Sequence, residues 1–521
     1  MSRTNVTSSS PKRVPLKESV NITDKERKIF DLLLQVVKHF KLETQLRVAG
    51  GWVRDKLLGK ECYDIDIALD NMLGREFCEK VNDYYVSIGK KKQRFGVIKS
   101  NPDQSKHLEI AKMQLFDVSI DFANLRSENY TENRGISIME FGTPEQDAYR
   151  RDLTINSLFY NLNTSTVEDY TGRGLDDLKC GRIVTPLIPK KTFLDDPLRV
   201  LRAIRFSARF EFDMVEEVKI AAVDNDVKTA ISGKIGRERI DHEIDLMLSG
   251  NQPVKAIECV SELGLFWVVF KNKFSKLPSN FEPEISEEYG RICVGYMDAA
   301  WRFLHALGGC TFNNEQQRLY LYGALLLPFR TTDYGDNKKR IISAVNHNFE
   351  NSLKPKGGDV IRLHNAVEKY LSLIPFIVSS EEECMKRIEV NWKSNMMIDV
   401  PVSLELRLLS GLIVREVKDL WRAALMLSIL LDNDSCVESK IEVFKKVEGW
   451  ILKLGLEKVW EVKPLINGRE IMKILEVENG GPVVSKWQQK VIQWQLAYPG
   501  GNVDECRDWM MSQTQLNPST T

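Results

Sequence analysis

The sequence predicts an α+β protein in which a small mixed sheet is followed by an all-helical remainder. Short apolar runs of strand length recur early in the chain and nearly vanish from about residue 195. These runs lie at 46–49, 63–69, 96–99, 108–111 and 118–122. Further along, apolar residues recur at helical spacing, as at Leu198, Leu201 and Ile204. A chain of 521 residues exceeds one hydrophobic core, so about two to four domains are expected.

The overall charge does not by itself indicate a nucleic-acid partner. The formal net charge is zero, and 28% of the residues are charged, as in ordinary soluble proteins. A nucleic-acid binder of this composition must gather its lysines and arginines on one face. The candidate clusters are Lys90–Arg94, Lys190–Lys191 and Lys338–Arg340, each of which is more simply a solvated surface cluster.

The cysteines argue against a disulfide framework and against a zinc site. There are nine of them, an odd number, scattered without any Cys-x-x-Cys pair. The six histidines show no metal-ligand spacing either. This pattern is typical of reduced thiols inside a cell. No apolar run reaches the length that crosses a bilayer, so no membrane association is expected.

The N-terminal residues support two interpretations. Residues 1–17 carry Arg3, Lys12, Arg13 and Lys17, several Ser and Thr, and no acid. This composition fits a disordered tail and also a weak mitochondrial presequence. Prolines within the segment disfavour a continuous amphipathic helix, so we favour the tail and keep targeting as the alternative. A helical pattern then begins at Asp24.

The most informative feature is a glycine pair followed by two aspartates. Gly50-Gly51 follows an apolar run, and a glycine turn brings bare backbone N–H groups close to a ligand, as phosphate sites need. Alternation in the run 63–69 places Asp64 and Asp66 on one face of a strand. An isolated Asp-x-Asp is most often a solvated strand end. Beside a glycine turn, the pair indicates an oxygen-rich site that suits Mg²⁺ bridging to phosphates.

Four ordered motifs resemble those of class II tRNA nucleotidyltransferases and bacterial poly(A) polymerases, within the DNA polymerase β superfamily. The first is Gly50-Gly51-Trp52-Val53-Arg54-Asp55 with Asp64-Ile65-Asp66. The others are Arg150–Leu158, Asp195–Phe206 and Gly236–Glu243. Together they span roughly residues 45 to 250. One departure is visible, because the third motif usually opens with Glu-Asp and here opens Asp195-Asp196.

The resemblance implies a role for each matching residue. Asp64 and Asp66 would be the catalytic carboxylates that hold Mg²⁺. Gly51 and Arg54 would meet the triphosphate, the first through its backbone and the second through its charge. Arg151 and Asp152 would contact the phosphate and ribose of the nucleotide. The competing interpretation of Arg151 is a salt bridge to Asp147 or Asp152, which we rate as the weaker one.

A third acid on a neighbouring strand positions the primer hydroxyl in this superfamily. The best match is Asp121, in the acid-hydrophobe strand that ends in Leu125-Arg126. Glu109, on the preceding candidate strand, is the alternative. The segment from Arg126 to Tyr149 then connects this strand to the Arg150 motif, and its Asn and Gly content suits a loop that reshapes the pocket.

The Asp195 motif contains two residues whose hydrogen-bonding groups could distinguish one nucleobase from another. Asp196 and Arg199 lie within one helical turn and could reach one ligand edge. An aspartate acceptor beside an arginine donor satisfies cytosine or adenine, whereas uracil and guanine reverse the donor–acceptor order. By resemblance the pair replaces a nucleic-acid template, and Arg202 and Arg205 serve phosphates. Without the resemblance, the arginine stripe would be a helix surface with salt bridges.

The resemblance implies a template-independent enzyme that adds C, C and A to the 3′ end of tRNA from CTP and ATP. The rivals are a poly(A) polymerase of the same family, an enzyme adding only CC or only A, and an inactive RNA-binding module. Intact Asp64 and Asp66 disfavour the last. The full-length stretch from Asp121 to Arg150 argues against CC-only addition and leaves A-only open. The run Pro464–Ile471 resembles the tail segment of CCA enzymes and favours tRNA.

The expected organisation is a disordered or targeting tail and four domains. These are residues 1–25 as the tail, 26–185 as a nucleotidyltransferase head, 186–260 as a helical neck that selects the base, 261–400 as a helical body and 401–521 as a helical, tRNA-binding tail. We expect a cytoplasmic monomer, with mitochondrial and nuclear pools as alternatives.

Overall fold

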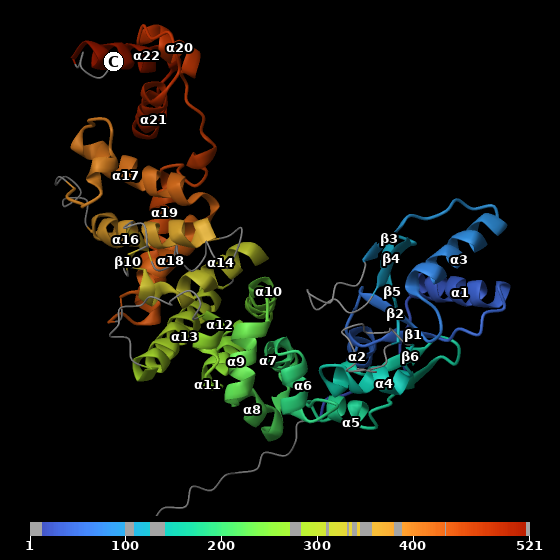
Figure 1. Cartoon of the computed structure of the whole chain (residues 1–521). Coiled ribbons are helices and arrows are strands. Elements are labelled where there is room, and N and C mark those ends of the chain that lie inside the picture. The colour runs from blue at the N-terminus through green and yellow to red at the C-terminus, as the bar shows by residue number, and fades with distance from the viewer. Residues whose placement is uncertain are drawn as a thin grey trace, which may run out of the picture. The chain divides into compact units, whose positions relative to one another are not determined.

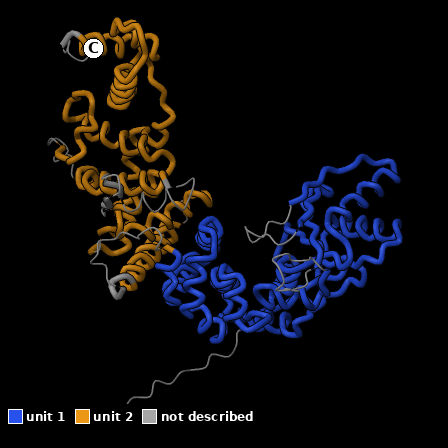
Figure 2. The backbone as a smooth tube through the Cα atoms, in the orientation of Figure 1, with its two compact units in different colours: residues 1–269 blue, residues 270–521 orange. Residues whose placement is uncertain are grey.

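The structure, a computed structural model, folds into two compact units, residues 1–269 and 270–521 (Figure 2). It describes residues 13–98, 109–125, 141–270, 283–308, 312–330, 333–335, 341–343, 357–379, 388–432 and 434–516. Residues 1–12 of the predicted tail, most of the expected loop after Arg126 and the cluster Lys338–Arg340 lie outside these ranges. The finer division into head, neck, body and tail stays a prediction.

The first unit is built on a seven-stranded mixed sheet with the order β3-β4-β5-β2-β1-β6-β7 (Figure 1). Its strands are β1 (Leu46–Ala49), β2 (Ile65–Leu69), β3 (Phe95–Ile98), β4 (Ile110–Leu115), β5 (Val118–Asn124), β6 (Phe159–Asn161) and β7 (Thr166–Glu168). Neighbours are antiparallel except for β2 and β5, which run parallel. The sequence predicted β1 to β5 and missed the short strands β6 and β7.

The helices of the first unit come before, within and after this sheet. They are α1 (Asp24–His39), α2 (Gly51–Leu57), α3 (Gly74–Ser87), α4 (Pro144–Tyr149), α5 (Gly174–Lys179), α6 (Pro189–Asp195), α7 (Leu198–Phe210), α8 (Glu216–Val223), α9 (Asn225–Lys234), α10 (Arg237–Leu248), α11 (Pro253–Glu262) and α12 (Phe266–Phe270). A short 3₁₀ turn, η2 (Thr154–Asn156), and a two-residue pair, β8 (Arg182–Ile183) with β9 (Asp213–Met214), complete the unit.

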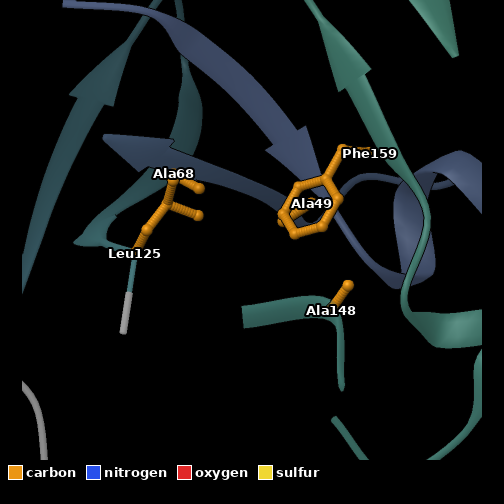
Figure 3. Packing of buried hydrophobic residues seen from close by; sticks show 5 residues of the cluster. All are labelled: Ala49, Ala68, Leu125, Ala148 and Phe159. Atoms are coloured by element: carbon orange, nitrogen blue, oxygen red, sulfur yellow. The ribbon is translucent and has the colours of Figure 1, made fainter. Parts of the chain in front are cut away.

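Alternation along β2 and β5 separates a buried face from a functional face. Ile65, Ile67 and Phe122 are fully buried, and α3 packs against β4 and β5 with the Phe77 and Phe122 rings 5.5 Å apart. The opposite face carries Asp66 and small side chains. A buried cluster there consists of Ala49, Ala68, Leu125, Ala148 and Phe159 (Figure 3). Three of these five residues are alanines, which leaves room for a ligand beside the carboxylates.

The second unit is helical apart from one small hairpin within its described residues. Its helices are α13 (Pro283–Ala306), α14 (Asn314–Leu325), α16 (Gly357–Val378), α17 (Val402–Val417), α18 (Trp421–Leu430), α19 (Val437–Lys453), α20 (Gly468–Ile474), α21 (Pro482–Ala497) and α22 (Val503–Leu516). The hairpin, β10 (Asp333–Gly335) and β11 (Ile341–Ser343), departs from the all-helical prediction. The side chains of α18 are buried between α16 and α19. None of the helices in the described ranges has the length and apolarity that a membrane crossing requires.

Candidate functional site

The glycine turn that leads into α2 is needed for close packing. Gly50 has a φ of +72°, a conformation that disfavours side chains. A Cβ at this position would lie 2.8 Å from Nη1 of Arg151, so any larger residue would displace that guanidinium. The Gly50 N–H donates to the carbonyl of Leu158 at 2.8 Å and joins the turn to the strand β6 region. Gly51 then begins α2.

A buried acid on α1 fixes the position of α2. Glu26 accepts hydrogen bonds from Nε1 of Trp52 at 2.9 Å and from Nζ of Lys56 at 2.7 Å. Burial alone would raise the pKa of Glu26, but the bonds from Lys56 and Thr23 outweigh it and hold the pKa below its usual value. Because Trp52 and Lys56 both belong to α2, the ionised Glu26 locks the helix that carries Arg54.

Two central strands of the sheet bring aspartates together. Asp66 and Asp121 are register partners on the parallel strands β2 and β5, and Asp64 precedes β2 by one residue. Register partners share a face, so Asp66 and Asp121 lie side by side. Crowding by protein atoms, followed by the negative charge of Asp64, raises the pKa of Asp66 to about 6. Lys112, on β4, contacts Asp121 at 3.0 Å with half of its side chain exposed, a weak tie in solvent.

The other candidate for the third acid lies elsewhere. Glu109 precedes β4 and lines neither of the two cavities described next, whereas Asp121 lines the first. The geometry therefore favours Asp121 over Glu109 as the acid beside Asp66.

Two adjoining cavities meet at Asp66. The first has a volume of 440 Å³, and it is lined by Ala49, Asp66, Ile67, Ala68, Ile110, Asp121, Ala123, Asn124, Asp147, Arg150, Arg151, Asp152, Asp196, Arg199 and Arg202. The second has a volume of 530 Å³, and it is lined by Gly51, Trp52, Arg54, Asp55, Glu61, Cys62, Tyr63, Asp64, Asp66, Arg151, Asp152, Asn156, Arg202, Phe206 and Arg209. Nearly all the residues predicted from the motifs therefore lie around one continuous space.

The shared wall of the two cavities is an ion-paired network. Asp152 accepts hydrogen bonds from Nε of Arg202 at 2.8 Å and from Nδ2 of Asn156 at 3.1 Å. Burial would raise the pKa of Asp152, but Arg202 and Asn156 outweigh it and lower the pKa. Asp152 therefore stays ionised and orients Arg202, whose Nη1 is also 3.8 Å from Glu243.

Arg151 forms the salt bridge that the sequence interpretation rated as the weaker alternative. Its Nη2 lies 2.8 Å from Oδ2 of Asp147, one helical turn earlier in the chain. It also lines both cavities, so the salt bridge does not remove it from the site. A guanidinium has five donors, so the salt bridge and a nucleotide contact are not exclusive, and the nucleotide contact of Arg151 stays a prediction.

The two residues predicted to select the base, Asp196 and Arg199, line the first cavity, but their arrangement differs from the predicted one. The helix α7 begins at Leu198, so Asp196 precedes it, and Oδ1 of Asp196 accepts from the Leu198 N–H at 3.2 Å. Its Oδ2 accepts from Nη2 of Arg239 at 2.9 Å. Arg199 donates to the carbonyl of Arg150 at 2.7 Å. Both side chains keep further donor or acceptor sites for a ligand.

Two predicted phosphate ligands are more enclosed than expected. Arg205 pairs with Glu243 at 2.6 Å and lines neither of the two cavities. The Arg54 side chain is buried, pairs with Asp55 at 2.8 Å and donates to the side chain of Asn156. Arg54 still borders the second cavity, so it can attract phosphate through its charge.

Sequence reasoning missed several residues that hold the site together. Arg239 and Glu243 lie on α10, within the motif Gly236–Glu243, to which the sequence analysis gave no contact with the other site residues. Phe206 is the last residue of the Asp195 motif and was given no role. Asn156 belongs to the Arg150 motif but was given no role. Their position inside recognised motifs was the available signal. The basic candidate Lys190 instead pairs with Asp224 and Asp226 at 2.8 Å each.

Comparisons with known proteins show to which family the chain belongs. A family model described as the poly A polymerase head domain matches residues 46–184. The mitochondrial CCA tRNA nucleotidyltransferase of Saccharomyces cerevisiae is 32% identical over 537 residues, covering 97% of this chain and 94% of that protein. This chain belongs to the tRNA nucleotidyltransferase family. Enzymes of this family generally use divalent metal ions.

Other members of the family match over similar lengths. The mitochondrial CCA tRNA nucleotidyltransferase of Candida glabrata is 32% identical over 528 residues, covering 95% of this chain and 96% of that protein. The crystal structure of the Bacillus stearothermophilus CCA-adding enzyme in complex with CTP is 18% identical, with a TM-score of 0.59. It covers 96% of this chain and 100% of that chain. The predicted α+β class of this tRNA nucleotidyltransferase is thereby confirmed.

Proposed function

We propose that this tRNA nucleotidyltransferase adds C, C and A to the 3′ end of tRNA from CTP and ATP, without a template and with release of pyrophosphate. One observation carries the proposal. The carboxylates Asp66 and Asp121 and the base-facing pair Asp196 and Arg199 line the same 440 Å³ cavity. The relatives named for CCA addition match nearly the full length of the chain, which favours tRNA over a poly(A) tail.

The carboxylates fit a divalent metal. Asp64 raises the pKa of Asp66, so the two negative charges oppose each other, and a cation relieves this repulsion. Within the described ranges, no three His, Cys, Asp or Glu side chains form a ready-made metal cluster. Mg²⁺ suits such a site, because it usually takes one or two carboxylates together with substrate phosphates and water. When bound, Mg²⁺ stabilises charge on the attacking and leaving oxygens.

The remaining side chains divide the work of binding and orientation. Asp121 holds the primer hydroxyl beside Asp66 and accepts its proton. Arg202 and Arg151 contact the phosphates from the shared wall of the two cavities. Gly51 presents backbone to the phosphates at the start of α2, and the buried Arg54 adds positive charge behind it. Asp152 orients Arg202. Arg205 acts through Glu243 and α10 rather than by direct contact.

Base selection rests on Asp196 and Arg199. Asp196 accepts from the exocyclic amine of cytosine or adenine, and Arg199 donates to the neighbouring ring acceptor. Arg239 donates to Oδ2 of Asp196 and the Leu198 N–H donates to Oδ1, so the direction of this carboxylate is fixed while each oxygen can accept a further hydrogen bond. The amine acceptor therefore stays in place when no base is bound.

The decisive experiment separates full CCA addition from its rivals. Purified protein is incubated with three tRNA transcripts lacking CCA, CA or A, and with each nucleotide separately. Stepwise addition of C, C and A, followed by arrest, supports the proposal. Addition of A to the CC-ending transcript alone would identify an A-only enzyme, CC without A a CC-only enzyme, and unlimited A a poly(A) polymerase.

We infer a mitochondrial pool from the names of the two relatives, and the cytoplasmic and nuclear pools stay predictions. Val14 and Lys17 lie within the predicted tail, but their backbone N–H groups already donate to the carbonyl groups of Lys179 and Leu57 in the predicted head, at 2.8 Å each. Deletion of residues 2–12 is therefore compatible with folding. Loss of mitochondrial import of a fluorescent fusion after this deletion would support the inference, and unchanged import would contradict it. Tail binding to tRNA and the monomeric state also stay predictions, testable by crosslinking and light scattering.

A further inference from the structure

A pair of stacked phenylalanine rings lies where α7 meets α2. The rings of Phe206 and Phe210 are 6.0 Å apart with an angle of 4° between their planes. Both rings are close to the Arg54 guanidinium, at 4.9 Å for Phe206 and 4.7 Å for Phe210. The two rings therefore form a continuous aromatic surface behind the cations of the second cavity.

The two rings also contact cationic side chains that have no role in the motifs. Phe206 also contacts Arg202 at 5.5 Å and Arg205 at 4.3 Å. Phe210 contacts Arg209 at 5.0 Å and Lys60 at 4.7 Å. Cation–π contacts hold guanidinium groups in place without neutralising them, so the positive charge stays available to an anion.

Arg209 is the most accessible arginine of this group on α7 and has the weakest ion pair. Its side chain is 43% exposed, compared with 35% for Arg202 and 11% for Arg205. It lies 3.3 Å from Asp55, a buried carboxylate that Arg54 already contacts at 2.8 Å. One carboxylate cannot neutralise two arginines. Arg209 also borders the second cavity, together with Gly51 and Asp64.

We propose that Arg209, held against the ring of Phe210, is an additional phosphate-binding residue for the terminal phosphate of the nucleoside triphosphate and for the departing pyrophosphate. This inference rests on the proposed function. Arg202 and Arg209 lie about two helical turns apart on one face of α7, so they form a row along the cavity wall. In this arrangement, Arg209 contacts the substrate and Phe210 is a positioning residue.

Binding measurements separate a triphosphate contact from a general effect. The full-length protein and the Arg209→Gln variant are titrated calorimetrically with ATP, AMP and inorganic pyrophosphate in Mg²⁺. The affinities of the variant for ATP and pyrophosphate should fall about 10- to 100-fold, as for a lost charge-assisted hydrogen bond, while AMP affinity is unchanged. Arg209→Lys should recover part of the loss, since lysine restores the positive charge but not the two parallel N–H donors of the guanidinium group.

A matched control is Arg182→Gln. Arg182 is exposed to a similar degree, 44%, and pairs at 3.0 Å with a buried carboxylate, Asp177, outside both cavities. This variant should bind all three ligands as the wild type does. Phe210→Leu should weaken pyrophosphate binding about threefold to tenfold, and Phe210→Tyr should not. Wild-type pyrophosphate affinity in Phe210→Leu would remove the positioning role.

Three outcomes would overturn the inference about Arg209. These are unchanged ATP affinity in Arg209→Gln, an equal loss for ATP and AMP, and a loss confined to tRNA affinity, which would assign Arg209 to the RNA backbone. The proposed function fails separately, if the wild-type protein does not extend tRNA even though the Arg209 variants change pyrophosphate binding.

Discussion

Asp66 and Asp121 are direct register partners across the parallel strands β2 and β5. Along the chain, α3, β3 and β4 separate them. Because residues in register on neighbouring strands lie side by side on the same face of a sheet, this pairing puts an acid from the Asp-x-Asp motif beside one from a strand much later in the chain. Strand pairing, rather than spacing in the sequence, therefore brings Asp121 beside Asp66.

The first prediction distinguishes the two candidates for this acid. Asp121→Ala should lower the rate of nucleotide addition at least about 100-fold, because the primer hydroxyl loses its proton acceptor beside Asp66. Glu109→Ala should retain near-normal rates, since Glu109 lines neither cavity. Single-turnover assays at saturating tRNA measure both. The reverse ranking would transfer the role to Glu109.

The second prediction concerns the stability cost of Asp66. Its pKa is raised to about 6 in the folded protein, so the folded state binds a proton more tightly than the unfolded chain does. The free energy of unfolding therefore falls as the pH rises from about 4 to 6. Asp66→Asn cannot ionise, so in EDTA at pH 7.5 it should melt at a higher temperature than the wild type. This gain should shrink as the pH approaches 4.5.

Two controls accompany the Asp66 measurement. Asp83→Asn removes an exposed acid 4.0 Å from Lys92 and should leave the melting temperature unchanged. Addition of Mg²⁺ should stabilise the wild type and not Asp66→Asn, because the metal binds only the folded site with both carboxylates. The variant should also lose nucleotide addition. A variant less stable than the wild type at pH 7.5 would show that the ionised Asp66 carboxylate does not destabilise the folded protein.

The third prediction separates backbone strain from crowding at the glycine turn. Gly50 and Gly89 have nearly the same φ, +72° and +73°, but a Cβ at Gly89 would meet nothing within 4 Å. Both alanine variants should lose about 1 kcal/mol of unfolding free energy from the backbone. Only Gly50→Ala should also lose nucleotide addition, because its methyl group would displace Arg151. Urea denaturation measures the unfolding free energies of the two variants. If both are equally destabilised and also equally active, crowding at Gly50 does not displace Arg151.

The fourth prediction concerns base choice. Asp196→Ala or Arg199→Ala should reduce the preference for CTP and ATP over UTP and GTP by about one to two decades, since each base contact contributes roughly 1–3 kcal/mol. Competition assays with mixed nucleotides and product sequencing measure the ratio. Loss of total activity with unchanged selectivity would make the pair structural only.

The sequence was sufficient for the parts of the site that depend on local patterns. Alternation placed Asp66 on the open face of β2, and the glycine pair predicted the turn before α2. Strand pairing is not local, so the sequence could favour Asp121 over Glu109 but could not show that Asp121 is the register partner of Asp66. The short strands β6 and β7, each of three residues, are too brief to show a period.

Side-chain pairing was the least predictable level. The sequence shows three arginines at three-residue spacing on α7, but not that Asp152 and Glu243 engage two of them. Asp152 lies two residues before η2 and Glu243 lies on α10, so the two acids are far apart in the chain. The helix start was also misjudged, because Pro197 permits a helix to begin after it and leaves Asp196 outside.

The helix α7 fixes the spacing between the residues at its two ends. Asp196 lies two residues before its first residue and Arg209 one residue before its last, so the proposed base contact and the proposed phosphate contact are separated by a fixed number of helical steps. Each residue adds about 1.5 Å and a rotation of roughly 100°. A single inserted residue would therefore turn Arg202 and Arg209 away from the cavity while leaving Asp196 in place. Evolution can change side chains along this helix, but we expect insertions and deletions within it to be excluded.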